Sequence, residues 1–476
     1  MNTLQKIEDA GHGLPVSVGS SESSDEWSYK EAGQESKWTG QFSLGTTFRQ
    51  FEDIELKKGG YDHADPQMID LGGKILLVYV DEDSSIEGDD RTVLRYQIFN
   101  KGDGANSRWL AVPGEIRAVR DGKTVNGALE PNLTDAGEKL LITWSAVTLP
   151  DSDHSDSEYM QDYLRGRDVY AAVVDKAQLR DTSATAPMTI DGALVSSEGD
   201  LYDTSPSGMY CHTDKGDSFT VSYLTSEAHT TEDPDSKESI LEMSTPTLNI
   251  SYIKTASYNS ETGKWETSFG VMKLNSTYNA QSGTWTPISG DDNLPSINNP
   301  TVIDLDSSTW GDWAIYTFAV DEDNNISTDE DREIFVKLEN IKTGNATVNQ
   351  LTHDGAYTDN DGVEHQGISK SRPQLVQAKG TVYLFWQQGS EDVAWLDLGE
   401  LITNKADQDT GVIDTENMPI KMVFYPTYGA QVTPTYANFK PFVDELDNLY
   451  LVWIQSVSED DKVKQELYAS LLKSEE

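Results

Sequence analysis

One stretch of the chain reads Arg372-Pro373-Gln374-Leu375-Val376, then Lys379-Gly380, then Val382-Tyr383-Leu384-Phe385-Trp386. It predicts two antiparallel strands joined by a tight turn. Proline is tolerated at the first residue of a strand, before the sheet needs its N–H. The second run is dense in aromatic and β-branched residues, which strands favour.

The same order of proline, strand, turn and aromatic-rich strand occurs six times along the chain. The copies begin at Asp65-Pro66, Glu130-Pro131, Ser205-Pro206, Asn299-Pro300, Arg372-Pro373 and Lys440-Pro441. A third strand follows each pair, and the spacing leaves room for a fourth. Repeated four-stranded units of this kind are typical of a β-propeller, so we predict an all-β fold, a six-bladed β-propeller. The alternative is an array of β-sandwich domains.

We expect a single propeller domain over residues 36–476, with blades at about 61–117, 118–196, 197–289, 290–364, 365–430 and 431–476. The last copy ends after its third strand. Residues 36–60 are therefore predicted to supply the missing outer strand, which would close the ring and cover a sheet edge. Residues 1–35 are rich in Ser and Glu and are predicted to form a flexible tail.

Composition restricts the class of partner. The 476 residues include 81 Asp and Glu against 36 Lys and Arg, a formal net charge of −45. Binding to nucleic acid needs clustered basic residues, and anionic membrane surfaces also attract bases, so both partners are excluded. No run approaches 18 apolar residues, so no membrane insertion is expected. The 11 Trp, 21 Tyr and 12 Phe indicate a folded protein with a substantial core.

The expected location is outside the cell. The chain holds a single cysteine, Cys211, which excludes an internal disulfide framework and predicts a small core residue. The composition favours an extracellular or cell-surface protein, although the first residues show no signal peptide. A cytoplasmic location is the alternative. We expect a monomer or a part of a larger multidomain chain.

The x-Pro-x-Leu/Val strand openings, and third strands such as Glu333-Ile334-Phe335, resemble those of the bacterial secreted six-bladed propellers of the sialidase-like type. The resemblance covers about residues 36–476. In that family an arginine triad holds the substrate carboxylate, and its first arginine lies in an Arg-Ile-Pro motif. The nearest match, Ser371-Arg372-Pro373, lacks the Ile and lies in the fifth repeat. The resemblance therefore implies a fold, with a degenerate site around Arg372 as one alternative.

A second resemblance concerns five-bladed glycosidases that act on arabinan and xylan. In those enzymes an Asp at the opening of the first strand acts as general base. The segment Tyr61-Asp62-His63-Ala64-Asp65-Pro66 resembles that opening. Glu130 is the candidate general acid. Inverting hydrolysis needs two carboxyl groups roughly 6.5–9.5 Å apart. If the chain is an enzyme, we therefore expect a glycoside hydrolase whose candidate catalytic residues are Asp65, Glu130 and Arg372.

The residues before the six prolines are expected to line one central opening, because each innermost strand of a propeller starts at the rim of the funnel. They are Asp65, Glu130, Ser205, Asn299, Arg372 and Lys440. Such a mixed polar ring suits a ligand rich in hydroxyl groups. We therefore predict a binding module for a neutral glycan, with a partner protein as the other ligand. In the alternative interpretation, these side chains satisfy one another and water.

Acidic loops follow several second strands and raise the possibility of a bound Ca²⁺ as cofactor. The candidate ligands are Asp81, Asp83, Asp321 and Asp323, whose oxygens suit hard divalent cations. The spacing departs from the EF-hand loop, and a solvated acidic face is the alternative. Acidity on the face of the opening disfavours an anionic ligand such as sialic acid. Two tight hairpins are also predicted, at Tyr258…Trp265 and Tyr278…Trp285.

Overall fold

The structure is a computed structural model of the 476-residue chain. It describes residues 42–48, 65–83, 85–86, 92–100, 108–109, 112–147, 167–183, 185–196, 202–213, 216–226, 230–232, 239–241, 251–259, 264–273, 276–279, 284–287, 301–321, 332–353, 357–358, 364–365, 367–389, 392–415, 418–423, 439–459 and 462–472. All structural statements below concern these residues.

The strands of the first half of the chain pair in three antiparallel groups. The first group is β2 (Gln67–Asp70), β3 (Lys74–Glu82), β4 (Thr92–Asn100) and β6 (Gly114–Arg120), with β5 (Arg108–Trp109) beside β4 and β7 (Lys123–Val125) beside β6. The second is β8 (Leu129–Ala136), β9 (Lys139–Val147), β10 (Arg167–Asp175) and β11 (Ile190–Leu194). The third is β12 (Tyr202–Thr213), β13 (Gly216–Ser226), β16 (Ser251–Asn259) and β17 (Lys264–Lys273).

Three further groups follow in the second half. The fourth is β20 (Thr301–Trp310), β21 (Trp313–Asp321), β22 (Glu333–Asn340) and β23 (Ala346–Gln350). The fifth is β26 (Lys370–Ala378), β27 (Thr381–Gln388), β28 (Asp392–Asp397) and β29 (Lys421–Val423). The sixth is β30 (Lys440–Val443), β31 (Leu449–Glu459), β32 (Lys462–Leu471) and β1 (Phe42–Phe48).

The remaining elements are short. Three two-stranded hairpins are β14 (Thr230–Glu232) with β15 (Ser239–Leu241), β18 (Ser276–Asn279) with β19 (Thr284–Pro287), and β24 (Tyr357–Thr358) with β25 (Glu364–His365). The two described helices are α3 (Lys176–Arg180) and α4 (Leu398–Lys405). Both predicted hairpins are confirmed, because Tyr258 pairs with Trp265 and Tyr278 with Trp285.

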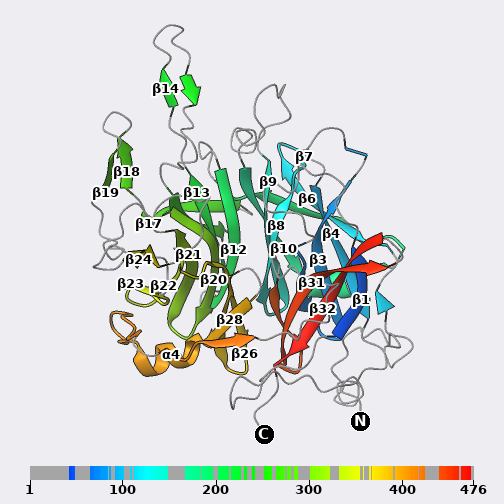
Figure 1. Ribbon diagram of the computed structural model, residues 1–476. Helices are drawn as coiled ribbons and strands as arrows, with labels where there is room; N and C mark the ends of the chain where they lie inside the picture. Colours follow the sequence, from blue (N-terminus) through cyan, green and yellow to red (C-terminus); the bar gives the residue numbers. More distant parts are fainter. Residues whose placement is uncertain are drawn as a thin grey trace, which may run out of the picture.

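The first strands of the six groups form a closed ring. Strand β2 contacts β8, β8 contacts β12, β12 contacts β20, β20 contacts β26, β26 contacts β30, and β30 contacts β2 again. The closing strand is β1, which pairs with β32 from Phe42↔Ala469 to Phe48↔Gln465. Figure 1 shows blue β1 beside red β32. The N-terminal closure is thus confirmed, as is the all-β propeller class. The count of six blades stays a prediction, and these pairings agree with it.

Each second strand is buried on both faces, because it lies between two hydrophobic clusters. In β3, Ile75, Leu77 and Tyr79 belong to the cluster shared with the sixth group. The residues between them, Leu76 and Val78, belong to the cluster shared with the second group. Successive side chains of a strand point to opposite faces, so both sets must be apolar. This explains why the second strands read as continuous apolar runs.

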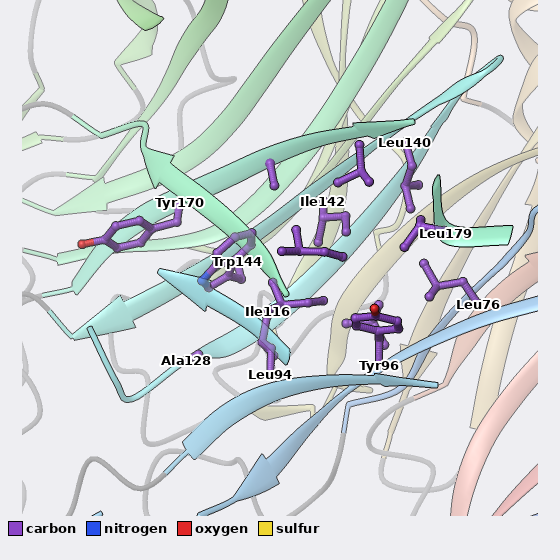
Figure 2. Close-up of a cluster of buried hydrophobic side chains, with 14 of the residues drawn as sticks. Leu76, Leu94, Tyr96, Ile116, Ala128, Leu140, Ile142, Trp144, Tyr170 and Leu179 are labelled. Atoms are coloured by element: carbon purple, nitrogen blue, oxygen red, sulfur yellow. The ribbon is translucent and has the colours of Figure 1, made fainter. Parts of the chain in front are cut away.

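Figure 2 shows the cluster between the first and second groups. Trp144 lies near its centre and stacks on Tyr170, with ring centroids 6.3 Å apart. The backbone of β11 passes directly over the indole. A Cβ at Gly192 would lie 2.0 Å from a ring atom of Trp144, so only glycine fits there. Such clusters occur between every pair of neighbouring groups. Among the described residues no helix has the length and hydrophobicity needed to cross a membrane.

Candidate functional site

The first strands carry a repeated irregularity. In β8, β12, β20 and β26 one extra residue shifts the pairing register, which is a β-bulge. A non-glycine residue with positive φ lies at each shift: Glu130 (54°), Ser205 (49°), Asp304 (52°) and Arg372 (53°). Asp65, just before β2, has a φ of 38°. The same backbone conformation therefore recurs around the ring.

This conformation is costly for residues other than glycine, by roughly 1–2 kcal/mol each. A bulge bends its strand and re-aims the side chain it carries, and bulges are common beside active sites. Together with Lys440, which occupies the same place in the sixth repeat, these residues form what we call the opening ring. Its members are Asp65, Glu130, Ser205, Asp304, Arg372 and Lys440.

Lys440 is the ring member without a positive φ. It pairs regularly with Val452 in β31. Its ammonium lies 3.5 Å from Oδ1 of Asp65 and donates a hydrogen bond to Oε1 of Gln374 at 3.3 Å. The side chains of Lys440 and Asp65 are only 15% and 10% exposed. This lysine therefore joins the first, fifth and sixth groups at the opening.

Glu130 contacts the next group around the ring. Its Oε2 accepts a hydrogen bond from the backbone N–H of Ser205 at 3.1 Å and another from the hydroxyl of Ser145 at 2.7 Å. Behind it, the buried guanidinium of Arg167 donates to Ser145 Oγ and to the carbonyl of Gly127. Sequence reasoning missed Ser145 and Arg167, because the chain of hydrogen bonds from Arg167 through Ser145 to Glu130 depends on the pairing of β8, β9 and β10.

In the fourth group the bulge lies at Asp304. Its Oδ2 accepts a hydrogen bond from the backbone N–H of Arg372 at 2.7 Å. The predicted member Asn299 lies outside the described residues. Sequence reasoning missed Asp304 because Leu305, and not proline, follows it. The available signal was the alternation Asp304-Leu305-Asp306, which has the same polar–apolar–polar order as Glu130-Pro131-Asn132.

Two residues beyond the opening ring lies a second polar set, which we call the inner ring: Gln67, Asn132, Ser207, Asp306 and Gln374. Asp306 is its centre and is 4% exposed. Its carboxylate accepts from Ser207 Oγ at 2.6 Å and from Asn132 Nδ2 at 3.4 Å. It also accepts from the backbone N–H groups of Leu375 at 2.6 Å and Ser307 at 3.0 Å. One side chain thus ties together the second, third, fourth and fifth groups.

Burial raises the pKa of Asp306 above the ordinary value of 3.8. The hydrogen bonds from Leu375, Ser207 and Ser307 and the charge of Lys440 oppose that shift. The side-chain amide nitrogen of Gln67, which is 7% exposed, has no hydrogen-bond partner within the described part of the chain. The inner ring is therefore largely satisfied by protein groups, with one donor left over.

The opening ring can therefore present both kinds of hydrogen-bonding group. Asp65, Glu130 and Asp304 supply carboxylate acceptors, Arg372 and Lys440 supply charged donors, and Ser205 supplies a hydroxyl. Four ring members, Asp65, Glu130, Asp304 and Lys440, make side-chain contacts to a neighbouring group. Such a set matches the alternating donors and acceptors of a polyhydroxylated ligand.

The predicted calcium ligands lie only partly within the described residues. Asp83 accepts hydrogen bonds from Ser85 and forms an ion pair with Arg95 at 3.1 Å. The Ser85 hydroxyl and amide, with the Arg95 charge, hold the pKa of Asp83 below its ordinary value. Asp81 accepts from the backbone of Glu82. Asp323 lies outside the described residues, and Asp321 is described only as the end of β21. The described residues hold no cluster of three potential metal ligands, and calcium stays a prediction.

No family model and no curated protein matches the chain. Among solved structures it is similar to Trypanosoma rangeli sialidase in complex with the inhibitor DANA, at 11% identity and a TM-score of 0.44. That similarity covers 86% of this chain and 55% of the sialidase, so the chain spans little more than half of the sialidase's length.

Two other similar structures are glycosidases. An alpha-L-arabinofuranosidase from Lactobacillus brevis has 10% identity and a TM-score of 0.36, with 72% of this chain and 90% of that chain covered. A glycosyl hydrolase from Bacteroides ovatus has 10% identity and a TM-score of 0.36, with 74% and 86% covered. Likeness at this identity concerns the fold alone.

Proposed function

We propose that the chain is a binding module whose opening ring takes a neutral, hydroxyl-rich glycan. The observation that carries this proposal is the repeated left-handed conformation at Asp65, Glu130, Ser205, Asp304 and Arg372. Five polar residues with a strained backbone occupy equivalent places in five of the six groups. Strained positions of this kind cluster at ligand sites.

The chemistry of the ring supports a sugar over an apolar ligand. Each hydroxyl group of a sugar both donates and accepts, so it pairs with carboxylates on one side and with lysine or arginine on the other. Hydrogen bonds to charged groups are the stronger kind. Lys440 Nζ and Asp65 Oδ1 lie 3.5 Å apart, so a hydroxyl group beside the pair would meet one donor and one acceptor.

Charge supports a neutral ligand over an anionic one. The ring contains three carboxylates and two bases, and the whole chain carries a net charge of −45. A ligand carboxylate would meet repulsion both at the site and in the long-range field. An extracellular location and a partner protein as ligand stay predictions beside this proposal.

The experiment is a glycan array probed with the full chain, with and without added calcium. The ring variants are Glu130→Gln and Lys440→Met. The controls are Asp312→Asn and Lys342→Met, which alter an exposed ion pair away from the ring. We expect neutral glycans to bind, binding to fall about tenfold or more in the ring variants, and the controls to match the unmodified chain. Binding limited to sialylated glycans, or unchanged in both ring variants, would contradict the proposal.

The same reagents distinguish binding from catalysis. Each array hit is incubated with the unmodified chain and with Asp65→Asn and Glu130→Gln, and the products are followed by chromatography. A binding module leaves the glycan intact. Hydrolysis that disappears in both variants would replace the binding proposal by a glycoside hydrolase with these two carboxylates.

A further inference from the structure

Two of the six groups continue from their third strand into a short helix and then a returning segment. In the second group, β10 leads into α3 and then β11. In the fifth group, β28 leads into α4 and then residues 406–413, whose ends are joined by a bridge between Ala406 and Ile413. Each returning segment lies against the fourth strand of the preceding group. We call α3 with β11 the first strap, and α4 with residues 406–413 the second strap.

The first strap continues the sheet of the first group into the second. Strand β11 pairs with β10 of its own group and also pairs, in parallel, with β6 of the first group. The guanidinium of Arg117 donates to both carboxylate oxygens of Asp191, at 2.8 and 3.1 Å. The buried hydroxyl of Tyr96 donates to the carbonyl of Met188 at 2.6 Å. Backbone pairing therefore runs without a break from the first group to the second.

The second strap is held to the fourth group by side chains. Asn349 of β23 donates to the carbonyl of Gly411 at 3.0 Å and accepts from the N–H of Ile413 at 2.8 Å. Asn345 donates to the carbonyl of Asp409 at 3.1 Å. Asn349 is buried, and Ile413 belongs to the hydrophobic cluster between the fourth and fifth groups. The second strap therefore joins these two groups at their outer strands.

Charged pairs add to the same two junctions. Lys370 of β26 lies 3.3 Å from Glu333 of β22, and both side chains are buried. Arg120 of β6 lies 2.7 Å from Asp168 of β10, which is also buried. Separating a buried ion pair leaves each charge without this partner in the protein interior, which is strongly unfavourable. The first and second groups, and the fourth and fifth, therefore resist separation along their whole width.

The third and sixth groups are joined to their neighbours differently. Hydrophobic clusters pack on both sides of each. The polar contacts described there are made beside the axis, on or just before first strands: Thr134 donates to the carbonyl of Gly208 at 2.9 Å, and Lys440 lies 3.5 Å from Asp65. Around the ring, the third group separates the two strapped pairs on one side and the sixth group on the other.

We propose that the straps divide the propeller into two double units, groups one and two and groups four and five, with the third and sixth groups as joints. In a repeat architecture, stability is approximately a sum of repeat terms and neighbour interface terms, so unequal interfaces produce separate cooperative units. The inner ring keeps the two units joined at the axis, where Asn132 donates to Asp306.

The opening ring is shared between the double units. Asp65 and Glu130 belong to the first unit, and Asp304 and Arg372 belong to the second. Movement of one unit against the other therefore changes the width of the opening. The inference goes beyond the glycan proposal and does not depend on it, because it concerns the chain without a ligand.

The test is native-state hydrogen exchange of the full chain at low urea concentrations, read by mass spectrometry of peptides from each group. We expect peptides from β3, β4, β9 and β10 to share one opening free energy, and peptides from β21, β22, β27 and β28 to share a second. Peptides from β12, β13 and β31 should open independently of both. A single opening free energy for all six groups, or different values within one double unit, overturns the proposal.

A variant of the second strap tests the cause of the coupling. The double variant Asn345→Ala with Asn349→Ala removes three hydrogen bonds to the strap. We expect the fourth group to exchange about tenfold faster than the fifth in this variant. The matched control is Asn340→Ala, which removes two hydrogen bonds inside the fourth group and should accelerate both groups equally. The same pattern in the two variants would show that the strap does not couple the groups.

Discussion

Asp304 and Asp306 lie two residues apart on strand β20, yet their surroundings differ. Asp306 is 4% exposed and accepts hydrogen bonds from three neighbouring groups of strands. Asp304 is half-buried in a left-handed bulge, and its carboxylate accepts from the backbone of Arg372. The comparison shows two roles along the first strands of the first five groups. The inner ring joins the sheets, and the opening ring one step above presents polar groups.

This separation explains how a strained set of residues can persist. The hydrophobic clusters and the inner ring fix the position of the first strands. The backbone at the opening is therefore held in a conformation that is unfavourable in isolation. Variants of the inner ring should therefore affect stability. Variants of the opening ring should affect binding first.

The largest expected effect is that of Asp306→Ala. It leaves Asn132 and the N–H of Leu375 without their acceptor in the core, and it removes one of two partners from Ser207 and from the N–H of Ser307, so we expect a loss of about 3 kcal/mol in the free energy of unfolding. Asp304→Ala should cost about 1 kcal/mol, since one hydrogen bond is lost. Urea unfolding followed by Trp fluorescence measures both. Equal losses of stability in the two variants would contradict the distinction between the inner ring and the opening ring.

The next effect is the pH dependence of the same carboxylate. Because the pKa of Asp306 is raised in the folded protein, the folded state holds its proton more tightly than the unfolded state. That contribution to stability is complete below the ordinary pKa of 3.8 and is lost as the pH rises through the folded value. Relative to Asp306→Asn, the free energy of unfolding of the unmodified chain should therefore fall as the pH rises from about 4. Parallel pH profiles would contradict the assigned shift.

A smaller effect is expected from Lys440→Met, which leaves the nearly buried carboxylate of Asp65 without its counter-charge. We expect a loss of about 2 kcal/mol in the free energy of unfolding. The matched control is Lys342→Met, whose ion pair with Asp312 is 70% and 52% exposed. That control should change stability by less than about 0.5 kcal/mol. A larger cost for the exposed pair would show that burial does not govern the contact.

The smallest effect concerns the bulges themselves. At Ser205, with a φ of 49°, glycine relieves the backbone strain, and Ser205→Gly should change the unfolding free energy by less than about 1 kcal/mol. Ser205→Val places a β-branched side chain in the left-handed region and should cost about 1–2 kcal/mol. Thermal unfolding of the two variants measures the difference. Equal stabilities would mean that the left-handed conformation is not maintained.

The strands were predictable because their patterns are local. The runs Lys74–Glu82 and Thr381–Gln388 are apolar on both faces, and a glycine-containing turn precedes each of them. The x-Pro pairs also located most of the opening ring, since proline follows the left-handed residue in four of its five copies. Asp304 was missed because the bulge of the fourth group has no proline. The proline used instead, Pro300, lies before β20.

The contacts between groups could not be predicted. Asp306 meets Ser207 and Leu375 only because the first strands close into a ring. Arg167 reaches Ser145 through the register of β10 against β9, where it pairs with Val147. Strand β6 exchanges β4 for β7 as its pairing partner between Ile116 and Ala118, and no periodicity in the sequence predicts that exchange. Local sequence patterns therefore predict the strands, whereas the contacts between groups depend on how the strands are arranged in the ring.

The most direct test of the central claim is a crystal structure of the full chain with the tightest neutral glycan from the array. The account predicts a sugar at the opening ring, with hydroxyl groups within hydrogen-bond distance of Asp65 or Lys440 and of Glu130 or Arg372. It also predicts an inner ring whose hydrogen bonds to Asp306 are unchanged. A glycan bound away from all six opening-ring residues would contradict the account.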